Sequence, residues 1–397
     1  MLYRVNNKNN DNISVLGYGC MRLPKKGLKI DLEKSTILIK KAIEHGVNYF
    51  DTAYIYPGSE EALGTILESE KLRDKVKIAT KLPLIMCKKE SDFDRFFSKQ
   101  LERLKTDRID YYLLHMLCDI DTFDKLKLLN IIEWIEKKKK EGSIKNIGFS
   151  YHGGKSEFNK LIDSYNWDFC MIQYNYLDEF NQAGKEGLHY AYNKGIPVFV
   201  MEPLRGGMLV NGLPEKAKKQ FNEVDKNRTL VEWSLRWIWN QKEVTMLLSG
   251  MNELKQLEEN VQIADRSDVD SLTKNELDVY GKVLEETNKL IKIPCTGCSY
   301  CMPCPQGVDI PTCFSCYNET FTHSYKSGFN RYFLTTGSTS IKQSNASKCV
   351  KCKLCEKHCP QNIEVSKRLT EVSKRMEPFW FRPVTGLIRK FMGIKVK

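Results

Sequence analysis

Residues 48–56 have the sequence NYFDTAYIY, a short apolar run that ends in Asp51 and is followed closely by Tyr56. A short run rich in aromatic residues is typical of a buried strand. In a parallel barrel the reactive side chains lie where the strands end, so a carboxylate in this place favours that fold. The stretch predicts a buried strand that leads into a functional site.

Similar apolar runs recur along the chain, separated by segments with apolar residues at three- and four-residue spacing. The predicted strands are 16–21, 48–53, 76–81, 109–115, 146–150, 169–174, 197–202 and 244–249. Strands that alternate with helices in this way predict an α/β protein built on a (β/α)8 TIM barrel. An open doubly wound sheet is the rival fold, but no G-x-G-x-x-G follows the first strand. We also expect a hairpin from residues 2–5 and 13–15, and single helices over 123–134 and within 270–292.

The composition changes sharply to Cys, Pro and Gly after Pro294. We therefore expect a barrel domain over 1–290, a cysteine-rich domain over 291–377 and a basic, aromatic tail over 378–397. The N-terminus lacks an apolar signal segment and no run of 18 apolar residues is present, so we expect a cytoplasmic protein. In that compartment clustered cysteines favour metal binding over disulfides.

The formal net charge of +12 is weak evidence for any partner. Residues 137–140 are four lysines ahead of Gly142, which is typical of a solvated helix end. Much of the remaining charge lies late in the chain. We expect no nucleic-acid partner, because an acidic protein or an anionic cofactor fits the charge as well.

Polar groups end three successive predicted strands: Asp51, Lys81 and His115. With Tyr56 they would meet at one side of the barrel mouth, and they suit the reduction of a carbonyl. A free tyrosine has a pKa of about 10, and a neighbouring ammonium group would lower it. Asp51 would keep Lys81 charged, and His115 would bind the substrate oxygen or relay a proton. Each group alone could be structural, but four together favour a catalytic site.

Eight segments of the chain, covering roughly residues 13–265, resemble the aldo/keto reductases. They are LGYGCMRLP (16–24), NYFDTAYIYPGSEEALG (48–64), IATKLP (78–83), LERLKTDRIDYYLLH (101–115), KNIGFS (145–150), MIQYNY (171–176), MEPLRGG (201–207) and LSGMNELKQLEEN (248–260). The resemblance implies an NAD(P)H-dependent reductase of a small-molecule carbonyl, with Tyr56 as general acid and Asp51, Lys81 and His115 as its catalytic partners.

The same resemblance implies a set of nicotinamide contacts. They are Gly19, Cys20, Ser150, Gln173, Glu259 and Asn260. Three positions depart from the family. Tyr151 stands in place of an Asn, Met201 in place of the Tyr that stacks on the nicotinamide, and Gln256 in place of an Arg that binds the 2′-phosphate. Arg is well suited to phosphate, so NADPH, NADH and FMN all stay open as cofactors.

The late cysteines form two runs. They are Cys295, Cys298, Cys301 and Cys304, and then Cys349, Cys352, Cys355 and Cys359, each run ending in Cys-Pro. The second run has the spacing of bacterial ferredoxins, in which the fourth Cys ligates the other cluster. We therefore expect two 4Fe–4S clusters, with Cys304 and Cys359 exchanged between the runs. Zinc, the alternative, prefers two separated pairs of ligands.

The spacing between the runs and the helical pattern after each Cys-Pro predict a mainly helical, dicluster ferredoxin-like domain. Cys313 and Cys316 fall on such a helix, and we expect them to be buried in the core and not to be cluster ligands. The tail is expected to pack on its own protein, with membrane or partner contact as the alternative. The whole chain resembles aldo/keto reductases fused to a 4Fe–4S domain.

Three hypotheses for the function follow. In the first, the barrel is a carbonyl reductase, and the clusters stabilise the protein or serve in docking. In the second, the clusters pass electrons between ferredoxin, or another redox protein, and a nicotinamide or flavin in the barrel. In the third, the chain is an electron carrier or redox sensor without catalysis. The intact catalytic residues argue against the third hypothesis.

Overall fold

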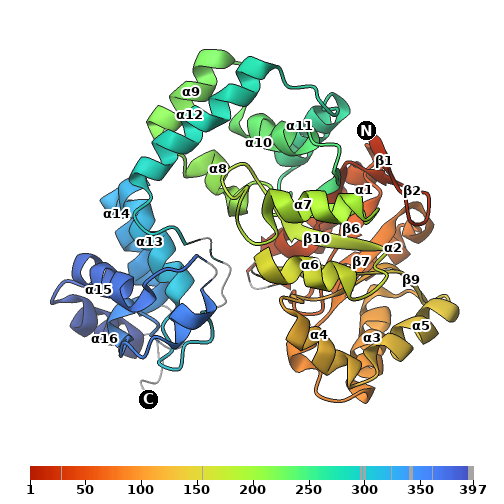
Figure 1. Cartoon of the computed structure of the whole chain (residues 1–397), viewed down its shortest axis with the longest axis horizontal. Coiled ribbons are helices and arrows are strands. Elements are labelled where there is room, and N and C mark those ends of the chain that lie inside the picture. The colour runs from red at the N-terminus through yellow and green to blue at the C-terminus, as the bar shows by residue number, and fades with distance from the viewer. Residues whose placement is uncertain are drawn as a thin grey trace. The chain divides into compact units, whose positions relative to one another are not determined.

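The computed structural model describes the chain apart from residues 28, 154, 296, 298–300, 323, 339–342, 360 and 392–397. Contacts divide it into two units. The barrel unit comprises Met1–Gly206 and Val231–Thr273, and the C-terminal unit comprises Gly207–Leu230 and Lys274–Lys397 (Figure 1).

Eight parallel strands close into a barrel in the first unit. They are β3 (Leu16–Gly19), β6 (Tyr49–Asp51), β7 (Lys77–Leu82), β8 (Ile109–Leu114), β9 (Ile144–Tyr151), β10 (Phe169–Gln173), β11 (Val198–Met201) and β12 (Val244–Ser249). The barrel closes where β12 pairs with β3. The predicted TIM barrel is confirmed and the open sheet is wrong. The expected hairpin is also present, as β1 (Tyr3–Asn6) and β2 (Asp11–Ser14).

Helices follow the strands, as the apolar spacing predicts. The barrel unit contains α1 (Leu32–Glu44), α2 (Ser59–Ser69), α3 (Ser91–Leu104), α4 (Ile120–Lys127), α5 (Ile131–Lys140), α6 (Lys155–Asp163), α7 (Gly184–Asn193), nearly all of α10 (Leu230–Trp239) and α11 (Leu254–Asp265). The single helix expected over 123–134 is wrong: it is broken at Asn130, whose φ of 60° is left-handed. Asn tolerates this conformation better than most residues, so the chain can turn there.

Aromatic rings fill the barrel interior. Tyr111 lies 5.1 Å from Phe169 and 5.2 Å from Tyr49, measured between ring centroids, and both contacts are edge-on. Phe199 completes this group. Each aromatic side chain buries a large apolar area, so this layer supports the strands whose ends carry the polar residues.

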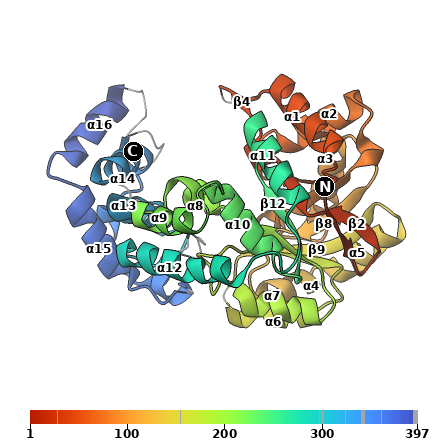
Figure 2. The same cartoon turned by 90° about the horizontal axis from the view of Figure 1, so that it is seen from above.

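The C-terminal unit is mainly helical, as predicted. It contains α8 (Met208–Asn211), α9 (Glu215–Val224), α12 (Lys274–Leu290), α13 (Ile310–Thr322), α14 (Tyr325–Tyr332), α15 (Val365–Met376) and α16 (Phe381–Phe391). Helices α9 and α12 lie side by side (Figure 2), and Phe221 packs edge-on against Tyr280 between them. In the tail, Phe381 is buried against Tyr332, which agrees with the expected packing, whereas Phe379 is exposed.

In the part of the chain that the structure describes, no helix is both long and apolar enough to cross a membrane.

Gly64 on α2 allows a close approach to α3. A Cβ atom built there would lie 2.4 Å from the carbonyl oxygen of Arg103 and 2.5 Å from the carbonyl carbon of Leu104. We expect Gly64→Ala to lower the free energy of unfolding by about 1–3 kcal/mol, because the two helix backbones must separate. Gly281→Ala on α12 is the control, since a Cβ there meets nothing within 4 Å and alanine favours a helix by about 1 kcal/mol.

Urea denaturation of both variants, followed by circular dichroism, checks this expectation. An unchanged midpoint for Gly64→Ala would contradict the close approach of α2 and α3.

Candidate functional site

The structure brings together the four residues expected to be catalytic. Asp51 ends β6, Lys81 lies near the end of β7, and His115 follows β8 directly. The Lys81 Nζ donates to Asp51 Oδ1 at 2.5 Å and to the carbonyl oxygen of Thr52 at 2.7 Å. Tyr56 lies in the loop before α2, with its ring centroid 5.2 Å from that same Nζ. The ring centroids of Tyr56 and His115 are 6.2 Å apart and nearly perpendicular.

Charges around Lys81 keep it protonated. Burial lowers the pKa of Lys81, but the attraction of Asp51 and Tyr56 and the hydrogen bond to Asp51 outweigh it, so that the pKa is raised. For Tyr56, burial raises the pKa and Lys81 lowers it, with a net rise. The expected lowering by Lys81 is therefore present, but it is smaller than the effect of burial. Burial therefore favours the protonated form of Tyr56 in this site.

His115 is neutral in this site. Burial, together with smaller electrostatic contributions from Lys81 and His152, lowers its pKa to about 3. A neutral imidazole donates from one nitrogen and accepts at the other, so His115 can bind an oxygen without competing with Tyr56 as an acid.

His152 is a second histidine at this end of the barrel that the sequence interpretation missed. It interacts electrostatically with Lys81, and burial lowers its pKa to about 4. The signal was available, because His152 directly follows β9 just as His115 directly follows β8.

A buried network behind Lys81 was also missed. Gln100 on α3 donates from Nε2 to the Lys81 carbonyl oxygen at 3.0 Å and to Glu60 Oε1 at 2.9 Å. Thr80 donates to the same Glu60 oxygen at 2.6 Å, and Arg103 Nη1 lies 3.1 Å from Glu60 Oε2. These bonds join α2, α3 and β7, and they fix the backbone from which Lys81 extends.

Gln173, at the end of β10, has the geometry of a binding group for an amide. Its Nε2 donates to Asp178 Oδ2 at 2.8 Å, while its Oε1 is buried and has no hydrogen-bond partner among the described residues. Asp178 is held in turn by Asn181 at 2.8 Å and by Arg205 at 3.2 Å. A buried acceptor without a partner is costly, so this oxygen suits a ligand that brings an N–H donor.

The other expected cofactor contacts lie around the same strand ends. Ser150 accepts from the backbone N–H of Met116 at 2.9 Å, which leaves its own hydroxyl proton free to donate. Asn260 on α11 donates to Ser249 at 2.9 Å. Gly19 ends β3, and a Cβ there would lie 3.4 Å from the Ser249 carbonyl oxygen.

The positions that depart from the family differ in exposure. Met201 ends β11 and packs partly on the barrel core. Gln256 is exposed on α11 and accepts from the Asn252 backbone N–H at 3.0 Å. Glu259 is half-buried on the same helix, and Cys20 is buried beside Asp51 and Lys81.

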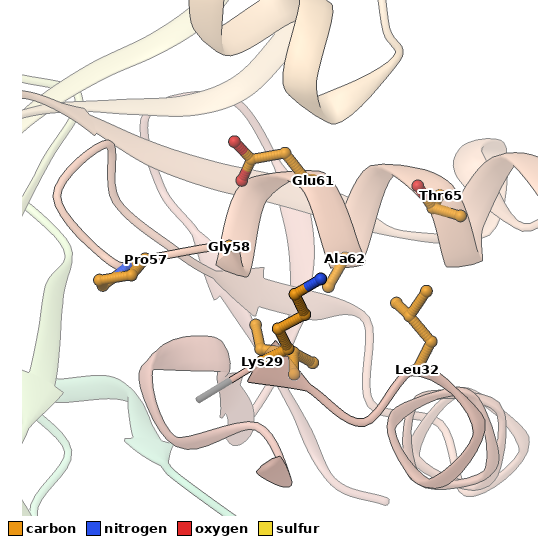
Figure 3. A pocket seen from close by; sticks show the side chains of 8 residues that line it. Lys29, Leu32, Pro57, Gly58, Glu61, Ala62 and Thr65 are labelled. Carbon is orange, nitrogen blue, oxygen red and sulfur yellow. The ribbon is translucent and has the colours of Figure 1, made fainter. Parts of the chain in front are cut away.

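A pocket of about 380 Å³ adjoins the loop that carries Tyr56 (Figure 3). Pro57 and Gly58 line it from this loop, and Glu61 and Ala62 line it from the first turns of α2. Lys29 lies on the opposite side, in the strand β5 (Lys29–Ile30). That strand pairs with β4 (Lys25–Lys26) in a short hairpin which the sequence interpretation did not predict. The pocket is lined by residues other than the four catalytic candidates.

The cysteine runs lie in the C-terminal unit, and Cys298 falls outside the described residues. Six of the other cysteines are partly buried against the core of this unit, and Cys352 is exposed. Burial raises the pKa of Cys355 to about 11, with further contributions from Cys349 and Cys304. Cys304 of the first run is thus near enough to Cys355 of the second run to interact with it electrostatically.

The two runs share local geometry. Gly297 and Lys351 stand one residue before the second cysteine of each run, and both have left-handed φ angles, of 74° and 59°. Gly307 and Asn362 stand three residues after each Cys-Pro cysteine and donate back to its carbonyl oxygen, at 2.8 and 3.0 Å. In the second run the Lys351 N–H also lies 3.4 Å from the sulfur of Cys349.

Across the described residues, no three Cys, His, Asp or Glu side chains are grouped closely enough to hold one metal ion. A 4Fe–4S cluster uses one cysteine for each iron, so its ligands stand farther apart than those of a single zinc ion. Cys313 and Cys316 are fully buried on α13, as expected of thiols in a core.

Two family models match different parts of this chain. The sequence model of the aldo/keto reductase family matches residues 15–277, and that of a 4Fe–4S dicluster domain matches residues 294–364. An uncharacterized oxidoreductase of Bacillus subtilis (strain 168), YqkF, is 28% identical over 293 residues, which cover 64% of this chain and 88% of the relative. L-galactose dehydrogenase of Arabidopsis thaliana is 25% identical over 272 residues, with coverage of 63% and 83%.

Solved structures resemble the barrel. The holo form of an aldo-keto reductase from Bacillus halodurans is 26% identical, with a TM-score of 0.60 and coverage of 71% of this chain and 96% of its own. A Klebsiella pneumoniae aldo-keto reductase in complex with NADPH is 21% identical, with a TM-score of 0.59 and coverage of 72% and 96%, and it supports the fold alone.

The depressed pKa of His115 leads to a prediction for NMR. With a pKa of about 3, its imidazole should keep the nitrogen shifts of a neutral ring from pH 8 down to pH 5 in ¹⁵N-histidine spectra. The His115 signal is assigned as the one that is missing from the spectrum of His115→Gln. Because an unfolded histidine has a pKa of about 6.5, the folded state binds fewer protons and should lose stability as the pH falls below that value. Titration of the His115 signal near pH 6.5 would show that the ring is not buried as described.

Proposed function

The chain belongs to the aldo/keto reductase family and carries a 4Fe–4S dicluster domain, and on that premise we propose that it reduces a small-molecule carbonyl with NADPH or NADH. Tyr56 is the proton donor in this proposal. The observation that carries it is the hydrogen-bonded Asp51–Lys81 pair beside the Tyr56 ring. A bound nicotinamide supplies the hydride.

Tyr56 and its neighbours manage the proton. When hydride reaches the carbonyl carbon, the oxygen gains negative charge and takes the Tyr56 proton. The Lys81 ammonium stabilises the phenolate that remains, and Asp51 holds Lys81 charged and oriented. Neutral His115 donates a hydrogen bond to the same oxygen and orients the carbonyl toward Tyr56.

Gln173 and Ser150 fit a nicotinamide amide. The free Oε1 of Gln173 accepts an amide N–H, and its Nε2 is held by Asp178 so that the side chain cannot turn over. The Ser150 hydroxyl is free to donate to an amide oxygen. Gly19, Cys20, Met201, Glu259 and Asn260 complete the proposed contacts, and an uncharged Gln256 disfavours strong selection for the 2′-phosphate of NADPH.

The C-terminal domain holds two 4Fe–4S clusters in this proposal, each of which carries one electron. One cluster is bound by Cys295, Cys298, Cys301 and Cys359, and the other by Cys349, Cys352, Cys355 and Cys304. The electrostatic contact of Cys304 with Cys355 supports the exchange of the fourth ligand. The proposed domains are 1–290 and 291–377, with the tail from 378.

A second candidate function is ferredoxin-linked electron transfer through a nicotinamide or FMN in the barrel. The dicluster domain favours it, since a purely structural role does not require two clusters. Stepwise anaerobic addition of NADPH or NADH distinguishes the candidates. Bleaching of the cluster absorbance near 400 nm supports electron transfer from the barrel, and flavin peaks in the starting spectrum would show that a flavin such as FMN is bound.

Removal of the Tyr56 hydroxyl tests the reductase. We expect Tyr56→Phe to lower kcat for a panel of aldehydes and ketones by about 10²–10⁴-fold, because the variant lacks the proposed general acid. Tyr54→Phe is the matched control, since the Tyr54 ring packs on Phe96 and Arg103. Equal turnover by Tyr56→Phe and the wild type would refute Tyr56 as the acid.

Removal of one cysteine tests the ligand assignment. After anaerobic reconstitution the wild type should bind about eight iron atoms, and Cys304→Ala should keep about four. Cys313→Ala should keep the full amount, because Cys313 is buried on α13 and is not a proposed ligand. The assignment fails if Cys313→Ala loses as much iron and sulfide as Cys304→Ala.

A further inference from the structure

The second cysteine run is surrounded by exposed lysines. They are Lys348, Lys351, Lys353 and Lys357, within a segment that contains one acid, Glu356. The first run, from Cys295 to Gly307, contains no charged residue. The two cysteine runs therefore differ in charge, although their spacing is similar.

These lysines are not used to stabilise the domain through ion pairs. Among the described residues, none of the four ammonium groups forms an ion pair with an acid. Of the four side chains only that of Lys348 donates a hydrogen bond, to the Gln343 carbonyl oxygen at 2.8 Å. The Glu356 carboxylate instead binds Ser366: its Oε1 accepts from the Ser366 N–H at 2.9 Å and from the Ser366 hydroxyl at 2.6 Å. The bonds from Ser366, and to a smaller extent the attraction of Lys353, lower the pKa of the Glu356 carboxyl, but most of the positive charge is left for solvent or a partner.

Lysines with a left-handed backbone stand on both sides of Cys352. Lys351 and Lys353 flank Cys352, and each has a φ of 59°, a left-handed conformation that costs a residue with a Cβ more than it costs glycine. The first run has Gly297 in the place that corresponds to Lys351, with a φ of 74°. Glycine adopts this conformation at a lower cost than lysine does.

Apolar side chains lie among these charges. Val350 is 61% exposed and Leu354 is 46% exposed, and Cys352 between them is exposed as well. An apolar centre with a polar rim is typical of protein interfaces, and redox partners form small ones of this kind. Lysines that surround such a centre favour a partner with an acidic surface.

We propose that Val350, Lys351, Lys353, Leu354 and Lys357 form a docking surface for an acidic one-electron redox protein, of the ferredoxin class. The inference rests on the proposed cluster held by Cys349, Cys352, Cys355 and Cys304. In each encounter the reduced partner loses one electron and this cluster gains one, and no bond or proton moves. Two encounters supply two electrons, which together with one proton from solvent make one hydride equivalent.

Charge reversal on this surface tests the proposal. The full chain, reconstituted without oxygen, is titrated with a purified acidic two-cluster bacterial ferredoxin at low and at high ionic strength. We expect K351E/K357E to raise the Kd about tenfold or more at low ionic strength, and the difference to shrink as salt screens the charges. The rate at which reduced ferredoxin bleaches the cluster absorbance should fall in parallel.

K326E/K374E is the matched control. It makes the same change in net charge with exposed lysines of α14 and of the last turns of α15, and we expect its Kd to stay within about threefold of the wild type. Cytochrome c, a basic one-electron protein, should bind the wild type more weakly than ferredoxin does.

Three outcomes would overturn the docking surface: equal binding by K351E/K357E and the wild type, equal losses in the control, or tighter binding of single-stranded DNA than of ferredoxin through these lysines. Iron and sulfide are measured in every sample. Wild-type protein without iron would overturn the cluster assignment first, so that failure is distinguishable from failure of docking at full iron content.

Discussion

The buried ion pair between Asp51 and Lys81 is the interaction on which the site depends. Two charges in a low-dielectric interior cost several kcal/mol each to desolvate, so such a pair is retained only with close geometry and further hydrogen bonds. The barrel supplies both, because β6 and β7 are neighbours in register and the Thr52 carbonyl takes a second bond from Lys81. The network of Glu60 and Gln100 then fixes the backbone of β7 from the outside. The pairing of β6 with β7, which forms part of the closed barrel, therefore also holds the Asp51–Lys81 pair beside Tyr56.

Much of this was predictable from periodicity and position. All eight barrel strands overlap the apolar runs of the sequence, and Asp51, Lys81 and His115 were placed at strand ends by the sequence alone. Contacts between distant helices were not, because nothing local in the sequence shows that Gln100 reaches Lys81. The break at Asn130 was missed for a similar reason: apolar spacing continues across it, and one left-handed residue is enough to end a helix. His152 was passed over although its position, one residue after a strand, matches that of His115.

In the C-terminal domain, the sequence alone predicts most of the candidate site. Cysteine spacing carries most of its chemistry, and the structure adds the proximity of Cys304 to Cys355 and the repeated turns around each Cys-Pro. The cysteine spacing does not show that the two runs differ in charge. The first run is uncharged, and the second is rich in lysine. A hydride carries two electrons and a cluster carries one, so a chain with both needs one-electron partners if its clusters take part in turnover. A basic surface at one cluster is consistent with that need.

The pH dependence of carbonyl reduction in Asp51→Asn tests most directly whether the ion pair controls the acid. Burial lowers the pKa of Lys81 and Asp51 raises it, so loss of the carboxylate should let Lys81 lose its proton at a lower pH. The account predicts that the basic limb of kcat/KM moves to lower pH in Asp51→Asn, with a matched loss of activity near neutrality. An unchanged basic limb, with activity close to that of the wild type, would contradict it.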